Sequence, residues 1–151
     1  MPDFTKEEVV NASAATVWAT WDNFGHIADW HPGLEKSALL DASQPTGLGA
    51  RRRCDMIGGK NFILEEIVEY QANQLMAVHI YDGNIPVKSA KVTFRIKPEG
   101  LNKARVSAEV EFNMKMGLLG ILIKPLVKKQ LGKDIAKLLK ANRGYAERQV
   151  I

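Results

Sequence analysis

The chain has 151 residues, of which 46% are apolar and 25% charged, a balance typical of a globular domain with a sizeable core. No stretch reaches the ~18 consecutive apolar residues of a membrane span, and the first residues lack the basic and then apolar layout of a secretory signal. The single cysteine, Cys54, permits no internal disulfide, which suits a reducing compartment. We therefore expect one domain over residues 1–151, located in the cytoplasm.

The first part of the chain predicts a strand followed by two short helices. Residues 4–10 have a weak strand pattern, and Ser13 then offers a hydroxyl that can cap the first turn of a helix. Gly25 is expected to end this helix. A second short helix then carries Ile27 and Trp30 up to a Pro-Gly pair that closes it.

The middle of the chain is typical of short strands separated by turns. Residues 89–96 and 105–112 alternate strictly between apolar and polar side chains. This pattern indicates one buried and one exposed face, and hence an antiparallel sheet covered on one side. Turns are expected at Gly58-Gly59 and at Asn73. The predicted strands after the two helices cover residues 36–40, 47–56, 62–69, 75–81, 89–96 and 105–112.

Residues 118–148 predict one long amphipathic helix, because apolar positions recur there at helical spacing. At ~1.5 Å per residue this helix would extend for about 45 Å. Pro125 has no backbone donor, so the helix either starts or kinks there. The simplest architecture is a curved antiparallel sheet wrapped around this helix. The predicted apolar face of the helix consists of Leu126, Val127, Leu131, Ile135, Leu138, Leu139 and Tyr145.

The same helix concentrates the positive charge of the chain. Residues 118–148 contain eight Lys or Arg and two Asp or Glu, a net charge of +6, which leaves −2 for the remainder of a chain whose total is +4. A basic stripe can bind nucleic acid or anionic lipid, or it can be the solvated face of the helix. We favour the solvated face. Because aromatic residues do not interleave with the lysines, we expect no nucleic-acid partner.

The turn at Gly58-Gly59 predicts the register of the two strands around it. If both glycines are central turn residues, Arg52 lies opposite Glu65 on the more apolar face of the hairpin. The free energy lost when two charges are removed from water is about as large as the free energy gained from their attraction. The inward pair therefore indicates either a structural cross-strand contact or a cavity in which a polar ligand group is oriented.

Five further residues are weaker site candidates. Val78 and Ile80 fall on the predicted face of the Arg52–Glu65 pair, while Trp21 and Trp30 either line the mouth of a pocket or belong to the core. His31 is either a polar pocket group or a surface-loop histidine. No histidine or acid spacing matches a metal signature, and phosphate-binding, dinucleotide and nucleophile motifs are missing. We therefore expect no metal, no cofactor and no catalytic residue, and we lean away from an enzyme.

Short motifs along the whole chain form a fairly specific set through their order and spacing. They are Val9-Val10-Asn11-Ala12-Ser13, Val17-Trp18, Trp30-His31-Pro32-Gly33, Gly47-Leu48-Gly49-Ala50-Arg51-Arg52, Leu64-Glu65-Glu66, Asp82-Gly83, Pro86-Val87 and Leu118-Leu119-Gly120. Together they resemble the START-like superfamily of polyketide cyclase/dehydrase and lipid-transfer proteins. The plant pollen allergens are similar in fold.

The resemblance implies an α+β helix-grip fold. In this fold a seven-stranded curved antiparallel sheet wraps around a long C-terminal helix, with two short helices after the first strand. The resemblance also implies a hydrophobic cavity between helix and sheet for lipids, steroids or polyketides. An inward Arg and Glu recur in the family's pattern, and Arg52 and Glu65 match those positions. Fold-level analogy does not by itself define chemistry.

Three functions are consistent with the sequence. The leading hypothesis is binding or carriage of a small hydrophobic ligand, and the alternative is a polyketide cyclase/dehydratase-like enzyme acting on a cavity-bound substrate. The third is a membrane-surface or protein-interaction module that uses the basic helix; we do not favour membrane contact, and the sequence favours no oligomeric state. The residues predicted to line the ligand site are Trp21, Trp30, His31, Arg52, Glu65, Val78, Ile80, Phe94, Phe112, Leu131 and Ile135.

Overall fold

A computed structural model describes residues 1–115 and 117–150, and over these residues it has the expected order of strand, two short helices, six strands and a long helix. The strands are β1 (Phe4–Val10), β2 (Leu34–Leu39), β3 (Arg51–Met56), β4 (Phe62–Gln71), β5 (Leu75–Gly83), β6 (Val87–Gly100) and β7 (Lys103–Met114). The helices are α1 (Ala14–Asp22), the 3-10 helix η1 (Phe24–Asp29) and α2 (Gly117–Arg148). None of these helices, within the part of the chain that is described, is long and apolar enough to cross a membrane.

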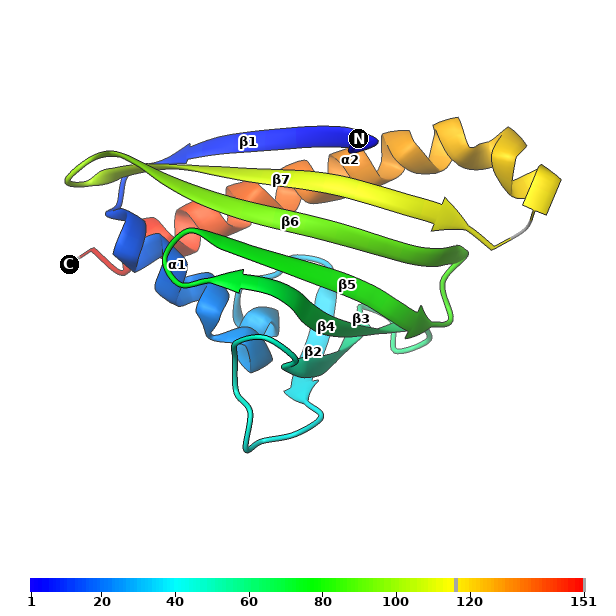
Figure 1. Cartoon of the computed structure of the whole chain (residues 1–151), viewed down its shortest axis with the longest axis horizontal. Helices are drawn as coiled ribbons and strands as arrows, with labels where there is room; N and C mark the ends of the chain where they lie inside the picture. The colour runs from blue at the N-terminus through cyan, green and yellow to red at the C-terminus, as the bar shows by residue number, and fades with distance from the viewer. Residues whose placement is uncertain (116, 151) are drawn as a thin grey trace.

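The strands form one antiparallel sheet in the order β1-β7-β6-β5-β4-β3-β2. Strands β2 to β7 therefore follow one another as a meander, and β1 pairs with β7 after the chain has crossed the sheet. Figure 1 shows the curved sheet with α2 passing behind β7 and beneath β1, and with α1 beside the C-terminal end of α2. The predicted α+β helix-grip fold is confirmed.

The predicted register of β3 and β4 is also confirmed, because Arg52 pairs with Glu65. The turn between these strands is wider than the expected two-residue hairpin, since residues 57–60 form the loop. Gly58 and Gly59 have φ of 101° and 70°, a region that side chains strain to enter. The two glycines still lie at the centre of the loop, so the longer turn leaves the register unchanged.

Several elements begin or end within a few residues of their predicted bounds, and two of the differences involve glycines. The strand predicted for residues 47–56 begins only at Arg51, because Gly47 and Gly49 have φ of 85° and 89° and belong to a turn. Gly25 does not end the first helix, since α1 already ends at Asp22. A Cβ on Gly25 would lie 2.7 Å from Leu39 Cγ. This glycine therefore allows η1 to pack closely against β2.

The N-cap of α1 is confirmed, because the Ser13 hydroxyl oxygen accepts a hydrogen bond of 3.1 Å from the Thr16 N–H. The second helix is a 3-10 helix that ends at Asp29, and Trp30 follows directly after it. The N–H of Trp30 donates to the Ile27 carbonyl at 3.2 Å. This bond holds the tryptophan close to the helix although it lies outside it.

Helix α2 begins at Gly117 and continues through Pro125. Of the two alternatives for Pro125, a helix start is therefore excluded, and the helix begins one residue before the predicted Leu118. A proline removes one backbone bond inside a helix, and in Figure 1 the α2 ribbon changes direction in its first half. Leu138 and Leu139 are buried as predicted, but Leu126 is 71% exposed. Its assignment to the inner face is wrong, because the step of ~100° from Val127 turns its side chain outward.

Gly83, at the end of β5, provides a test of backbone packing beside β4. Its φ is 148°, and a Cβ there would lie 2.6 Å from the Phe62 carbonyl oxygen. Gly58 has a φ of 101° but open space around it. We expect Gly83→Ala to lower the free energy of unfolding by about 1–3 kcal/mol more than Gly58→Ala, because only the first adds a clash to backbone strain. Urea unfolding measures this difference, and equal losses would contradict the clash.

Candidate functional site

A buried ion pair lies on the inner face of the sheet. Arg52 of β3 donates from Nε to Glu65 Oε1 of β4 at 2.8 Å, and the two residues are 4% and 7% exposed. Arg52 Nη1 also donates to the Phe24 carbonyl of η1 at 2.9 Å, and the guanidinium carbon lies 3.8 Å from the centre of the Phe24 ring. One side chain therefore links two strands and a helix.

Cys54 completes the polar contacts of this pair. Its thiol donates to Glu65 Oε1, with sulfur and oxygen 3.3 Å apart. Burial raises the pKa of the Cys54 thiol, and the negative charge of Glu65 raises it further. The residue therefore stays a neutral thiol and lacks the thiolate that a nucleophile needs. Among the described residues, every buried side-chain nitrogen and oxygen has a hydrogen-bond partner.

His31 lies in the electrostatic field of the ion pair. Burial lowers the pKa of His31 to about 4, an effect that Glu65 and Asp134 oppose and Arg52 reinforces. Its Nδ1 accepts a hydrogen bond of 2.9 Å from the Gly33 N–H. This acceptor role leaves the ring proton on Nε2 in the neutral form. His31 is half-buried, so it is neither a fully exposed loop residue nor sealed in the core.

The tryptophans belong to an aromatic cluster at one end of the core. Trp21 lies 4.1 Å from Phe94 and 4.8 Å from Trp30, measured between ring centroids. Its Nε1 donates to Asn142 Oδ1 of α2 at 3.1 Å. Trp30 stacks on Tyr145 at 6.3 Å. The geometry agrees with the core interpretation of Trp21, whereas Trp30 also reaches the surface cleft described below.

The remaining predicted site residues separate by burial. Val78 and Phe112 are fully buried in the core, whereas Ile80, Leu131 and Ile135 are only half-buried. Ile80 pairs in register with Glu65 and so shares its inner face. Ile80 is therefore partly exposed on the face of the sheet that carries the ion pair. The structure thus groups Arg52, Glu65, His31 and Ile80, and leaves Phe112 apart beneath Lys124.

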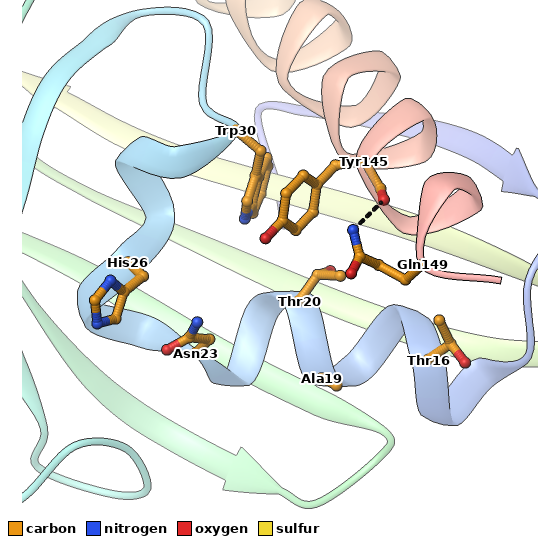
Figure 2. Close-up of a pocket in the computed structure, with 8 residues that line it drawn as sticks. All are labelled: Thr16, Ala19, Thr20, Asn23, His26, Trp30, Tyr145 and Gln149. Carbon is orange, nitrogen blue, oxygen red and sulfur yellow. Dashed lines mark hydrogen bonds between the residues drawn. The ribbon is translucent and has the colours of Figure 1, made fainter. Parts of the chain in front are cut away.

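A hollow lies on the surface between α1, η1 and the end of α2. Figure 2 shows the rings of Trp30 and Tyr145 side by side along it, with the Gln149 side chain donating to the Tyr145 carbonyl at 3.1 Å. This cleft has a volume of about 310 Å³. It is lined by Thr16, Ala19, Thr20, Asn23, His26, Trp30, Tyr145 and Gln149. Of these residues, only Trp30 also belongs to the predicted ligand site.

Sequence reasoning missed several contacts around the ion pair. Phe24 holds Arg52 through a backbone carbonyl, for which no sequence signal exists. Asp134 acts on His31 from α2, more than a hundred residues away. Cys54 could have been included, because strand alternation places it two residues after Arg52, on the same face of the hairpin.

The ion pair generates a prediction about stability. Arg52→Met or Glu65→Leu leaves one buried charge without its partner, so each should lower the free energy of unfolding by about 3–5 kcal/mol. The double variant leaves neither charge, so its loss should be smaller than the sum of the two single losses. Urea unfolding of the four proteins measures this coupling. Additive losses would show that the two side chains do not stabilise each other.

The lowered pKa of His31 generates a prediction about pH. The unfolded chain takes up this proton near the ordinary histidine pKa of 6.5, whereas the folded chain takes it up at about 4. The contribution of His31 to stability is therefore complete above pH 6.5 and is lost as the pH falls toward 4. We expect an NMR titration midpoint near pH 4 for His31. As the pH falls from 6.5 to 4, the free energy of unfolding should decrease less in His31→Asn than in the wild type. A midpoint near 6.5 would contradict the burial of this ring.

Solved structures share the fold over nearly the full chain. The Zhui aromatase/cyclase from Streptomyces sp. R1128 has a TM-score of 0.83 at 17% identity, covering 98% of this chain and 94% of that one. A START superfamily protein from Mycobacterium smegmatis has a TM-score of 0.81 at 20% identity, covering 97% and 98%. TTHA0849 from Thermus thermophilus has a TM-score of 0.80 at 19% identity, covering 97% and 98%.

At these identities the likeness shows the fold alone. No curated protein sequence matches the chain. The family described as polyketide cyclase / dehydrase and lipid transport matches residues 1–147. The match covers nearly all of the sequence, and the chain belongs to this family.

Proposed function

We propose that this protein binds and carries a small hydrophobic ligand in the space between the inner face of the sheet and α2. The observation that carries the proposal is the half-exposed Ile80 beside the buried Arg52–Glu65 pair. Membership of a family of ligand-binding folds supports it. Leu131 and Ile135 of α2 add apolar surface that is only half-buried, and covering such surface is worth ~25 cal/mol per Å².

The polar groups of the site would orient the ligand rather than supply most of the affinity. Arg52 provides a donor and Glu65 an acceptor on the inner face, and neutral His31 provides a donor at Nε2. A lipid, steroid or polyketide-like molecule has long apolar surface and few hydroxyl or carbonyl groups. Such a molecule matches a site in which a small number of polar groups fix the orientation of an apolar body.

Three features favour binding over turnover. Arg52 and Glu65 neutralise each other, and Cys54 remains a thiol because burial raises its pKa. His31, with a pKa of about 4, is a weaker proton acceptor than a general base working near neutral pH.

We also infer a cytoplasmic location, because a single buried thiol suits a reducing compartment.

The proposal predicts that filling the inner space abolishes ligand uptake. Freshly purified protein should carry an apolar molecule in native mass spectrometry, and emptied protein should take up a lipophilic fluorescent dye. Ile80→Trp places a larger ring beside Glu65, so dye affinity should fall by about ten-fold or more. Tyr81→Trp is the control, because it enlarges the ring at the next residue of β5, which lies beside His79 on the opposite face.

The outcomes of this experiment separate clearly. Loss of dye binding in Ile80→Trp with unchanged binding in Tyr81→Trp supports an inner ligand site, provided that both variants unfold cooperatively. Equal dye affinity in the two variants would show that the dye does not enter the space beside Ile80. A protein that is purified empty and takes up no dye would end the carrier proposal.

A further inference from the structure

The first turns of α2 expose a set of large aliphatic side chains. These side chains, here named the α2 apolar patch, are between 57% and 82% exposed, whereas most large apolar residues of the protein are buried or half-buried. The patch consists of Leu118, Leu119, Ile121, Leu122 and Leu126. Exposed apolar clusters of this kind mark surfaces that contact another body.

The patch lies on the outer face of the helix. At ~100° per residue the five side chains span an arc of about 160°. Leu118 and Leu122 lie near the centre of this arc, opposite the buried Gly120 and Leu138, whereas Ile121 lies at its edge in the direction of the buried Leu139. The leucines at the centre therefore point away from the sheet. Further along the helix, the same outer face carries exposed lysines in place of leucines. These are Lys129, Lys133, Lys137 and Lys140.

The charge around the patch is mainly positive, although Asp3 forms an ion pair of 3.3 Å with Lys124. Residues 117–140 contain six lysines and one aspartate. A cleft of about 430 Å³ opens between the start of α2 and the ends of β6 and β7. Met114 and Ile121 give it apolar walls, and Lys88 of β6 adds a further cation beside Lys124. Apolar side chains that continue into a cationic stripe are complementary to a surface that is apolar inside and anionic outside.

We propose that the start of α2 docks on an anionic lipid surface. The α2 apolar patch enters the boundary between headgroups and acyl chains, and the lysines on the same face contact the anionic headgroups. A second copy of the chain fits this surface less well, because two such faces would bring like charges together. The proposal extends the function beyond carriage, and it holds whether or not the inner space takes a ligand.

Vesicle sedimentation tests the proposal with the full-length chain. We expect binding to vesicles of roughly 3:1 phosphatidylcholine and phosphatidylglycerol at low salt, little binding to phosphatidylcholine alone, and weaker binding as salt rises. Leu122→Ser/Leu126→Ser should weaken binding by about ten-fold or more, since both side chains leave the lipid. Both residues are exposed, so the variant should keep its thermal unfolding midpoint.

Matched controls lie at the other end of the molecule. Leu101, in the β6–β7 turn, is 91% exposed, and Figure 1 shows this turn at the opposite end from the start of α2. Leu101→Ser should leave vesicle binding unchanged. Lys129→Gln/Lys133→Gln should reduce binding to anionic vesicles, whereas the exposed pair Lys97→Gln/Lys103→Gln near that turn should not.

Three results would overturn the proposal. The first is an absence of sedimentation with anionic vesicles at low salt, and the second is equal vesicle binding by the wild type and Leu122→Ser/Leu126→Ser. The third is a wild-type protein that binds no vesicles but forms a concentration-dependent dimer, and a double variant that stays monomeric. The last result would identify a second copy as the occupant. Dye uptake should be unaffected in the patch variants, so failure of membrane docking and failure of ligand carriage are separate outcomes.

Discussion

The buried Arg52–Glu65 ion pair is the contact on which the inner face depends. It is held by the register of β3 and β4, and through the Phe24 carbonyl it fixes η1 against the same strands. Neither charge can be released alone without leaving the other desolvated and unpaired. The pair therefore anchors the polar part of the concave face, and His31, which follows η1, is held within its field.

Apolar packing is tight at one end of this face and looser at the other. Trp21 and Phe94 close the end beside the last turns of α2, where Leu138 and Leu139 are buried. Ile80 and the middle of α2 are only half-buried. A long helix lying across a curved sheet touches it best over part of its length. The proposed ligand would cover the apolar surface that this mismatch leaves half-buried.

Sequence reasoning reached the fold and the ion pair because both follow from local periodicity. A strand alternates its faces every residue, so the position of Gly58-Gly59 was sufficient to place Arg52 opposite Glu65. It failed where the deciding contact was non-local or belonged to the backbone, as with the Phe24 carbonyl. Leu126 was misassigned because spacing alone shows that a stripe exists, and only the sheet shows which side of a helix is inner.

The exposed Leu126 draws attention to the difference between the inner and the outer face of α2. Apolar side chains on the inner face are explained by the core, but nothing in folding requires leucines on the opposite face. Along that outer face the side chains change from leucine to lysine just beyond Pro125, in the half of the helix where the ribbon changes direction. A solvated face would favour polar residues along its whole length, whereas a helix that meets a lipid surface at one end needs both chemistries in this order.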